Sequence, residues 1–181
     1  MKYAAFLRGI NLGKVRRISN ADLKRHFEGM GLEEVGTFRA SGNVIFTAGR
    51  ESEAKLKSRV EKALKEALGY DVTVFLRDET ELRAIAQLQP FPPATVARSK
   101  GKLQVSMLPK KPAAKARDAV LAVATEDDPL AFGERELYWL PSGGQMESEL
   151  DLNAIEKLVG PTTRRTMGTI EQIAAKHFAA D

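Results

Sequence analysis

The sequence predicts an α+β fold in which one order of elements occurs twice. The spacing of apolar residues over positions 3–77 predicts the order strand, helix, strand, strand, helix, strand. The same order returns after residue 101. Prolines at positions 90, 92 and 93 separate the two stretches. The order βαββαβ is that of the ferredoxin-like motif. We therefore expect two ferredoxin-like subdomains in tandem, each with helices packed on one face of an antiparallel sheet.

The first subdomain is predicted over residues 1–88. Residues 3–7 form a short apolar run typical of a buried strand. A helix is expected between Ser19, which has capping-box spacing to Asp22, and Met30, which precedes Gly31. The other predicted elements are a hairpin of strands 35–39 and 44–47, a helix over 52–68, a strand over 72–76 and a short helix after residue 78.

The second subdomain is predicted over residues 102–181. Its expected elements are strands 102–108, 130–132, 137–140 and 162–167, and helices 113–124, 152–159 and one after residue 168. The segment 162–167 has almost no apolar residues and is assigned from its place in the order. The intervening prolines are expected to prevent regular structure, so residues 89–101 are predicted to be a linker.

Composition excludes several classes of protein. The 181 residues include no cysteine, which excludes disulfides and thiolate chemistry and favours a cytoplasmic protein. No apolar run approaches the roughly 18 residues of a membrane span, so no membrane association is expected. The net charge of +4 permits an anionic partner without requiring one. The sequence does not indicate an oligomeric state.

A basic loop is the first candidate binding feature. The connection over residues 8–18 is longer than the usual two to six residues and contains four basic residues and no acid. Its glycines allow backbone amides to approach a ligand, and it leads into a helix N-terminus, which favours anions. A solvated basic loop whose helix is capped by Ser19 is the alternative interpretation.

Topology adds a second candidate feature. The first two strands of a βαβ crossover run in the same direction, so the basic loop, the turn at residues 41–43 and the connection at residues 69–70 should lie at one end of the sheet. Ordinary turn chemistry is the alternative for residues 41–43. The candidate ligand-binding residues are Arg8, Gly9, Asn11, Gly13, Lys14, Ser41, Gly42 and Asn43.

These features favour a protein that binds a small anionic ligand such as a nucleotide or a phosphorylated metabolite. An enzyme that uses the same site is the first alternative, although no catalytic residue can be assigned. Nucleic-acid binding through basic segments such as 98–117 is the second, although the third strand lacks the stacking aromatics of RNA-recognition domains. His26 and His177 are interpreted as boundary residues of helices, and no metal site or cofactor is expected.

Several segments resemble a known bacterial family. They are residues 3–13 (YAAFLRGINLG), 21–23 (ADL), 38–46 (FRASGNVIF) and 137–139 (LYW). In these segments the chain resembles the family catalogued as domain of unknown function 1697. The resemblance implies two ferredoxin-like subdomains and no assigned activity. Near the C-terminus, residues 163–169 lack the asparagine and the aromatic residue of the family's pattern.

Overall fold

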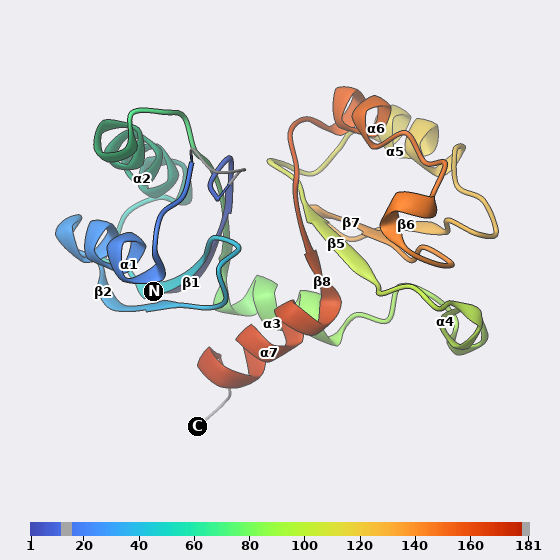
Figure 1. Cartoon of the computed structure of the whole chain (residues 1–181), viewed down its shortest axis with the longest axis horizontal. Coiled ribbons are helices and arrows are strands. Elements are labelled where there is room, and N and C mark those ends of the chain that lie inside the picture. Colours follow the sequence, from blue (N-terminus) through green and yellow to red (C-terminus); the bar gives the residue numbers. More distant parts are fainter. Residues whose placement is uncertain (12–15, 179–181) are drawn as a thin grey trace. The chain divides into compact units, whose positions relative to one another are not determined.

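The computed structural model describes residues 1–11 and 16–178 and has a mixed α+β fold with two four-stranded antiparallel sheets (Figure 1). The chain divides into two compact units. The first comprises Met1–Arg83 and the described residues after Ala175, and the second comprises Ala84–Ala175. Within the described residues, no helix has the length and apolar character needed to cross a membrane.

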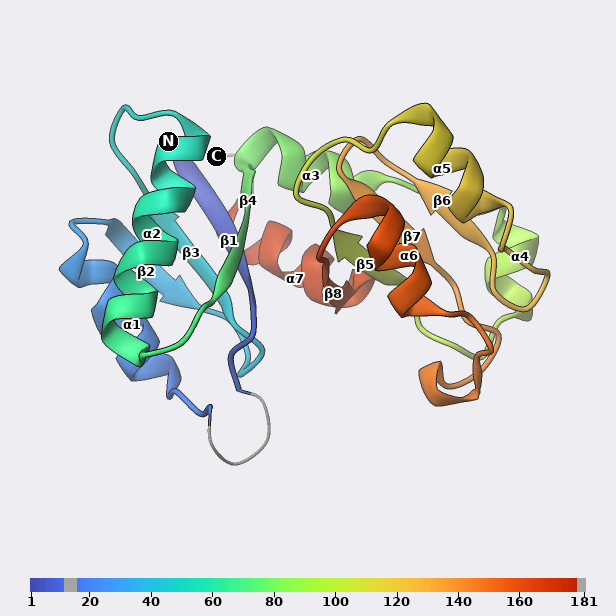
Figure 2. The same cartoon turned by 90° about the horizontal axis from the view of Figure 1, so that it is seen from above.

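The first unit contains the predicted order of elements. They are β1 (Lys2–Arg8), α1 (Asn20–Gly29), β2 (Glu33–Thr37), β3 (Asn43–Thr47), α2 (Glu53–Leu68) and β4 (Thr73–Asp78). The strand order is β2-β3-β1-β4, with all neighbours antiparallel. Helices α1 and α2 cover one face of this sheet (Figures 1 and 2).

Local sequence signals set the helix ends in this unit. The Ser19 hydroxyl accepts a hydrogen bond from the Asp22 amide (3.0 Å) at the start of α1. Gly69 ends α2 in the left-handed conformation, at φ 77°. Between the helices and the sheet lies an apolar core whose fully buried members include Ala5, Phe27, Val44, Phe46, Leu56, Val60, Leu64 and Val74.

The second unit repeats the strand order. Its elements are β5 (Gln104–Met107), α5 (Ala114–Leu121), β6 (Leu130–Phe132), β7 (Glu136–Trp139), the 3₁₀ helix η1 (Gln145–Glu147), α6 (Leu152–Val159) and β8 (Thr163–Thr166). The sheet order is β6-β7-β5-β8, again antiparallel throughout. Helices α5 and α6 pack together beside this sheet (Figure 1). The chain passes from the first unit to the second within α3 (Glu79–Gln87), after Arg83. It returns to the first unit within α7 (Met167–His177), after Ala175.

Strand β8 confirms the expected strand, although its sequence is polar. It pairs with β5 along its length, and Arg165 lies opposite Val105. The Arg165 guanidinium donates from Nη1 to the Thr163 hydroxyl (2.9 Å) and to the Arg164 carbonyl (2.8 Å). Burial lowers the pKa of Arg165 to about 10, so the side chain stays charged at neutral pH. Backbone pairing with β5 and the hydrogen bonds that Arg165 donates therefore stabilise this strand, although its sequence lacks the alternating apolar residues of a typical strand.

The proline-rich segment contains a helix that the sequence analysis excluded. Helix α4 (Pro93–Arg98) lies inside the expected linker over residues 89–101. Pro93 is its first residue, a position where the missing N–H would have no helical partner and where the fixed φ suits a helix. Prolines therefore begin this short helix instead of preventing it. The predicted subdomain limits, 1–88 and 102–181, stay a prediction.

The hairpin of the first sheet also differs from expectation. Asn43 was expected in the turn, but it is the first residue of β3 and only 1% exposed. Its Nδ2 atom donates to the Phe38 carbonyl (2.8 Å) and to the Ser41 hydroxyl (2.9 Å). The left-handed residues of the connection are Arg39 (φ 57°) and Gly42 (φ 73°). Asn43 thus stabilises the turn by hydrogen bonds from its position at the start of β3.

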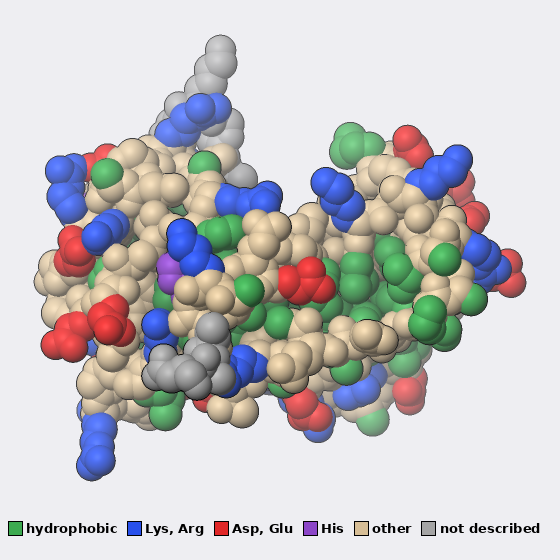
Figure 3. Space-filling view, turned by 90° about the horizontal axis from the view of Figure 1, so that it is seen from below, with side chains coloured by type: hydrophobic (Ala, Val, Ile, Leu, Met, Phe, Trp, Pro, Cys, Tyr) green, Lys and Arg blue, Asp and Glu red, His purple; other side chains and the backbone are tan. Residues whose placement is uncertain are grey.

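The end of α7 carries a histidine that should make stability depend on pH. The Nε2 atom of His177 is buried without a hydrogen-bond partner. Burial lowers the pKa of His177, and the charges of Lys176 and Lys2 lower it further. Figure 3 shows Lys and Arg side chains (blue) distributed over one face of the molecule.

The protonated form of His177 is therefore disfavoured in the folded state. The unfolded chain takes up the proton near pH 6.5, so this contribution to stability is constant above that pH and is lost as the pH falls below it. We expect the melting temperature of the wild type to fall more between pH 7 and 5 than that of His177→Gln. Equal falls in the two proteins would contradict this role.

Candidate functional site

Three connections meet at one end of the first sheet, as the strand directions predicted. They are the residues between β1 and α1, between β2 and β3, and between α2 and β4. The Leu7 amide at the end of β1 donates to the Gly42 carbonyl (2.8 Å). The guanidinium carbon of Arg16 lies 4.8 Å from the centre of the Tyr70 ring. The end of β1 therefore contacts the second connection, and the first connection contacts the third.

Asn11 holds this end together. It adopts a left-handed conformation, at φ 53°. Its Nδ2 atom donates to the Ala40 carbonyl in the neighbouring connection (2.6 Å), and its Oδ1 atom accepts from the Ile18 amide (3.0 Å). One side chain thus joins the start of the basic loop to its end and to the β2–β3 connection.

Substitution of Asn11 should loosen this end of the sheet. Asn11→Ala removes both side-chain bonds and places a Cβ-bearing residue without a local partner at positive φ. We expect a loss of about 1–3 kcal/mol in the free energy of unfolding of the first unit. Asn11→Gly keeps the backbone conformation accessible and should cost less. Chemical denaturation of the two variants measures the difference, and equal stability of Asn11→Ala and wild type would contradict the bracing role.

The sequence-predicted site residues have different environments. Asn11, Ser41 and Asn43 are hydrogen-bonded within the connections described above. Gly9 and Gly42 both have positive φ. Arg8 is the last residue of β1, half-buried and opposite Thr73 of β4. Gly13 and Lys14 lie outside the described residues.

Arginines dominate the charge at this end. Arg16, Arg17 and Arg39 are exposed, and Arg8 lies beside them at the end of β1. Each of the two acids on these connections and on the first turn of α1 has a basic partner. Asp22 forms an ion pair with Arg25, and Asp71 forms one with Lys65 (2.8 Å). The resulting excess of positive charge suits an anion.

The N-terminus of α1 itself is occupied by the chain's own side chains. The Ser19 hydroxyl accepts from the Asp22 amide and donates to the Asp22 carboxylate (2.6 Å). The negative carboxylate of Asp22 also lies in the first helical turn, where it interacts favourably with the helix dipole. This capping arrangement is the alternative that the sequence left open, so the arginines and not the helix end give the site its charge.

Arg39 is a member of this end that the sequence analysis missed. It was assigned to the second strand, but it follows β2 and adopts φ 57°. Its guanidinium carbon lies 5.6 Å from the centre of the Phe38 ring. A positive φ at a non-glycine residue costs about 1–2 kcal/mol, and such conformations concentrate at functional sites. No local sequence signal indicates this conformation, because arginine is not a usual left-handed residue.

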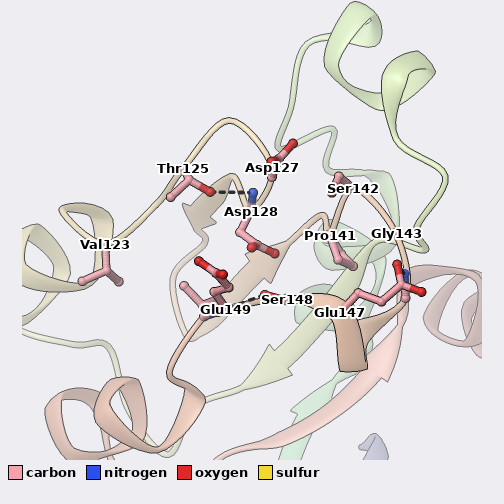
Figure 4. Close-up of a pocket in the computed structure, with 12 residues that line it drawn as sticks. Val123, Thr125, Asp127, Asp128, Pro141, Ser142, Gly143, Glu147, Ser148 and Glu149 are labelled. Atoms are coloured by element: carbon pink, nitrogen blue, oxygen red, sulfur yellow. Dashed lines mark hydrogen bonds between the residues drawn. The ribbon is translucent and has the colours of Figure 1, made fainter.

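A separate cavity of about 530 Å³ lies in the second unit (Figure 4). The residue pair Asp127 and Asp128 reaches it from the connection before β6, while Pro141 and Ser142 come from the chain after β7. The remaining lining residues are Val123, Thr125, Gly143, Gly144, Glu147, Ser148, Glu149 and Leu150. Its size is within the range of small-molecule sites.

The lining of this cavity is acidic. It includes four carboxylates and no lysine or arginine. Asp128 is 7% exposed, and its Oδ1 atom accepts from the Trp139 indole N–H (2.7 Å), which fixes the side chain. Within the described residues, no group of three or more His, Cys, Asp or Glu is arranged to hold a metal ion. Because like charges repel, this cavity disfavours an anionic ligand.

Comparison with known proteins identifies a family and a shared fold. A family model described as "Protein of unknown function (DUF1697)" matches residues 1–138. No curated protein matches the sequence. Among solved structures, the chain is similar to the conserved bacterial protein SP0830 from Streptococcus pneumoniae, at 22% identity and a TM-score of 0.75 over 97% of this chain and 98% of that one. The family model covers most of the sequence, and the chain therefore belongs to the DUF1697 family of proteins of unknown function.

Proposed function

We propose that the protein binds a small anionic ligand, such as a nucleotide or a phosphorylated metabolite, at the arginine end of the first sheet. This name denotes Arg8 at the end of β1, Arg16 and Arg17 on the connection between β1 and α1, and Arg39 on the connection between β2 and β3. The observation that carries the proposal is the bracing of these connections by the Asn11 side chain and by the cation–π contact of Arg16 with the Tyr70 ring. Bracing reduces the conformational entropy that the arginines lose when they bind.

The architecture supports this assignment. We infer that the chain contains two ferredoxin-like subdomains, with limits near 1–88 and 102–181, and the sheet orders β2-β3-β1-β4 and β6-β7-β5-β8 support that inference. Loops at the end of a rigid sheet are common positions for binding groups. The absence of cysteine supports a cytoplasmic location, where phosphorylated ligands are available.

Arg8→Ala is the first test of the proposal. Arg8 continues directly from a buried strand, so its backbone is better fixed than those of the other three arginines. Loss of a charge-assisted hydrogen bond costs about 1.5–3 kcal/mol, which weakens binding roughly 10- to 150-fold. Isothermal titration calorimetry with inorganic pyrophosphate measures this change. The matched control is Arg50→Ala, which removes an exposed arginine that follows β3 at the opposite end of the sheet.

The proposal requires that Arg8→Ala weakens pyrophosphate binding while Arg50→Ala leaves it within about twofold of the wild type. Arg17→Ala provides a second variant at an exposed position in case Arg8→Ala does not fold. An equal loss of pyrophosphate affinity in Arg50→Ala would indicate that the protein's positive charge attracts pyrophosphate nonspecifically. If the wild type binds neither pyrophosphate nor a phosphorylated compound such as adenosine monophosphate, the proposal is overturned.

A further inference from the structure

We propose that the ligand of the arginine end is a nucleotide, with its base stacked on an arginine plane. This inference rests on the proposed function and narrows its ligand class. It distinguishes a nucleotide from a phosphorylated sugar, which carries a similar phosphate but no flat aromatic group.

The observation behind it is a repeated pairing of arginine with an aromatic ring. The guanidinium carbon of Arg16 lies 4.8 Å from the ring centre of Tyr70. The guanidinium carbon of Arg39 lies 5.6 Å from the ring centre of Phe38. Each arginine is exposed, whereas each ring is half-buried. The two pairs lie on different connections of the same end. In each pair the ring is the more buried partner and the guanidinium is the more exposed one.

A guanidinium supported in this way can perform two tasks. Its contact with the ring holds the plane in place by cation–π attraction. Its edge N–H groups can donate to phosphate oxygens, since arginine presents a planar fork of donors. Its outer face can stack a base, because bases stack on arginine planes as well as on aromatic side chains. A lysine at either position would keep the charge and lose the plane.

The surrounding charges complete the arrangement. Arg8 and Arg17 come from the same end of the sheet and provide positive charge for the phosphate groups. Asp71, on the connection that carries Tyr70, is paired with Lys65 at 2.8 Å, so its repulsion of a phosphate is reduced. The chain thus supplies phosphate-binding charge and base-stacking planes together.

The test compares two ligands that differ only in the base. Adenosine monophosphate and ribose 5-phosphate are titrated into the wild-type protein, with inorganic pyrophosphate as a third probe. Stacking of one base should make adenosine monophosphate bind about 5- to 150-fold more tightly than ribose 5-phosphate. If pyrophosphate binds but adenosine monophosphate binds no more tightly than ribose 5-phosphate, the nucleotide inference is overturned and the proposed function remains. If none of the three binds, the proposed function itself is overturned.

Arginine-to-lysine variants locate the stacking plane. The double variant Arg16→Lys, Arg39→Lys should lose most of the preference for adenosine monophosphate over ribose 5-phosphate, because lysine keeps the charge and lacks the plane. The matched control is Arg117→Lys in the second unit, because Arg117 is also stacked on an aromatic ring, at 5.2 Å from the centre of Phe132. The control should keep the full preference. A double variant that still prefers adenosine monophosphate would overturn the assignment of the base to these two planes.

Discussion

Gly42→Ala should lower the free energy of unfolding of the first unit by about 2–5 kcal/mol. The backbone of Gly42 has φ 73°, which costs an alanine about 1–2 kcal/mol. A Cβ there would also lie 2.6 Å from Cδ1 of Ile10 and 3.1 Å from Cβ of Leu7. Rotation of the Ile10 side chain relieves these contacts only in part, because Cβ of Leu7 is fixed to the backbone of β1, and such overpacking costs about 1–3 kcal/mol.

Gly31→Ala separates the two causes. Gly31 has the same φ of 73°, but a Cβ there would have no heavy atom within 4 Å. Gly31→Ala should lower the free energy of unfolding only by the cost of positive φ at an alanine, about 1–2 kcal/mol. Amide hydrogen exchange in β1 and β3 measures the stability of the first unit for both variants. If the two substitutions lower the free energy of unfolding equally, the close contacts of residue 42 with Ile10 and Leu7 contribute nothing.

Gly101→Ala should destabilise the second unit strongly. A Cβ on Gly101 would lie 2.0 Å from the carbonyl oxygen of Pro141 and 2.6 Å from that of Gly143. Both are backbone atoms, so no side-chain rotation relieves the clash. The segment is also held by the Ser99 hydroxyl, which donates to the Pro141 carbonyl (2.6 Å), and by the Lys100 amide, which donates to the Ser142 carbonyl (2.9 Å). We expect a loss of about 3 kcal/mol, the upper part of the range for overpacking.

The protein's one tryptophan makes this loss measurable. Trp139 lies in β7 of the second unit, so its fluorescence during denaturation with urea follows that unit. Gly168→Ala is the matched control, because Gly168 lies in α7 within the same unit and a Cβ there has open space. That variant should be as stable as the wild type or more stable by up to about 1 kcal/mol, since alanine favours a helix. A Gly101 variant with wild-type stability would contradict the close approach.

Periodicity and element order predicted most of the fold. The strand expected at residues 162–167 was assigned from element order alone, and β8 (Thr163–Thr166) forms there although its sequence is polar. Its stability depends on pairing with β5, a long-range property that no local pattern carries. Helix α4 was missed because proline is usually a helix breaker, whereas at the first position of a helix it is favourable.

The candidate site was predicted less completely. Strand directions indicated that the three connections meet, because a crossover fixes which ends of the strands lie together. The roles of Asn11 and Asn43 as internal braces depend on contacts with carbonyl groups far along the chain or across the turn. The left-handed conformation of Arg39 was not predictable, since arginine rarely adopts it. The cavity of the second unit was not predicted, because only the fold brings together the four carboxylates that line it.

Chemical-shift mapping of the bound anion shows directly whether it lies at the arginine end of the first sheet. A titration of the ¹⁵N-labelled protein with adenosine monophosphate, followed by NMR, reports which amides change. Binding at the arginine end should give saturable shifts concentrated at residues 8–11, 16–18, 38–42 and 69–71, with little change elsewhere. Shifts concentrated instead in the basic segment 98–117 of the second unit, or no saturable shift at all, would contradict it.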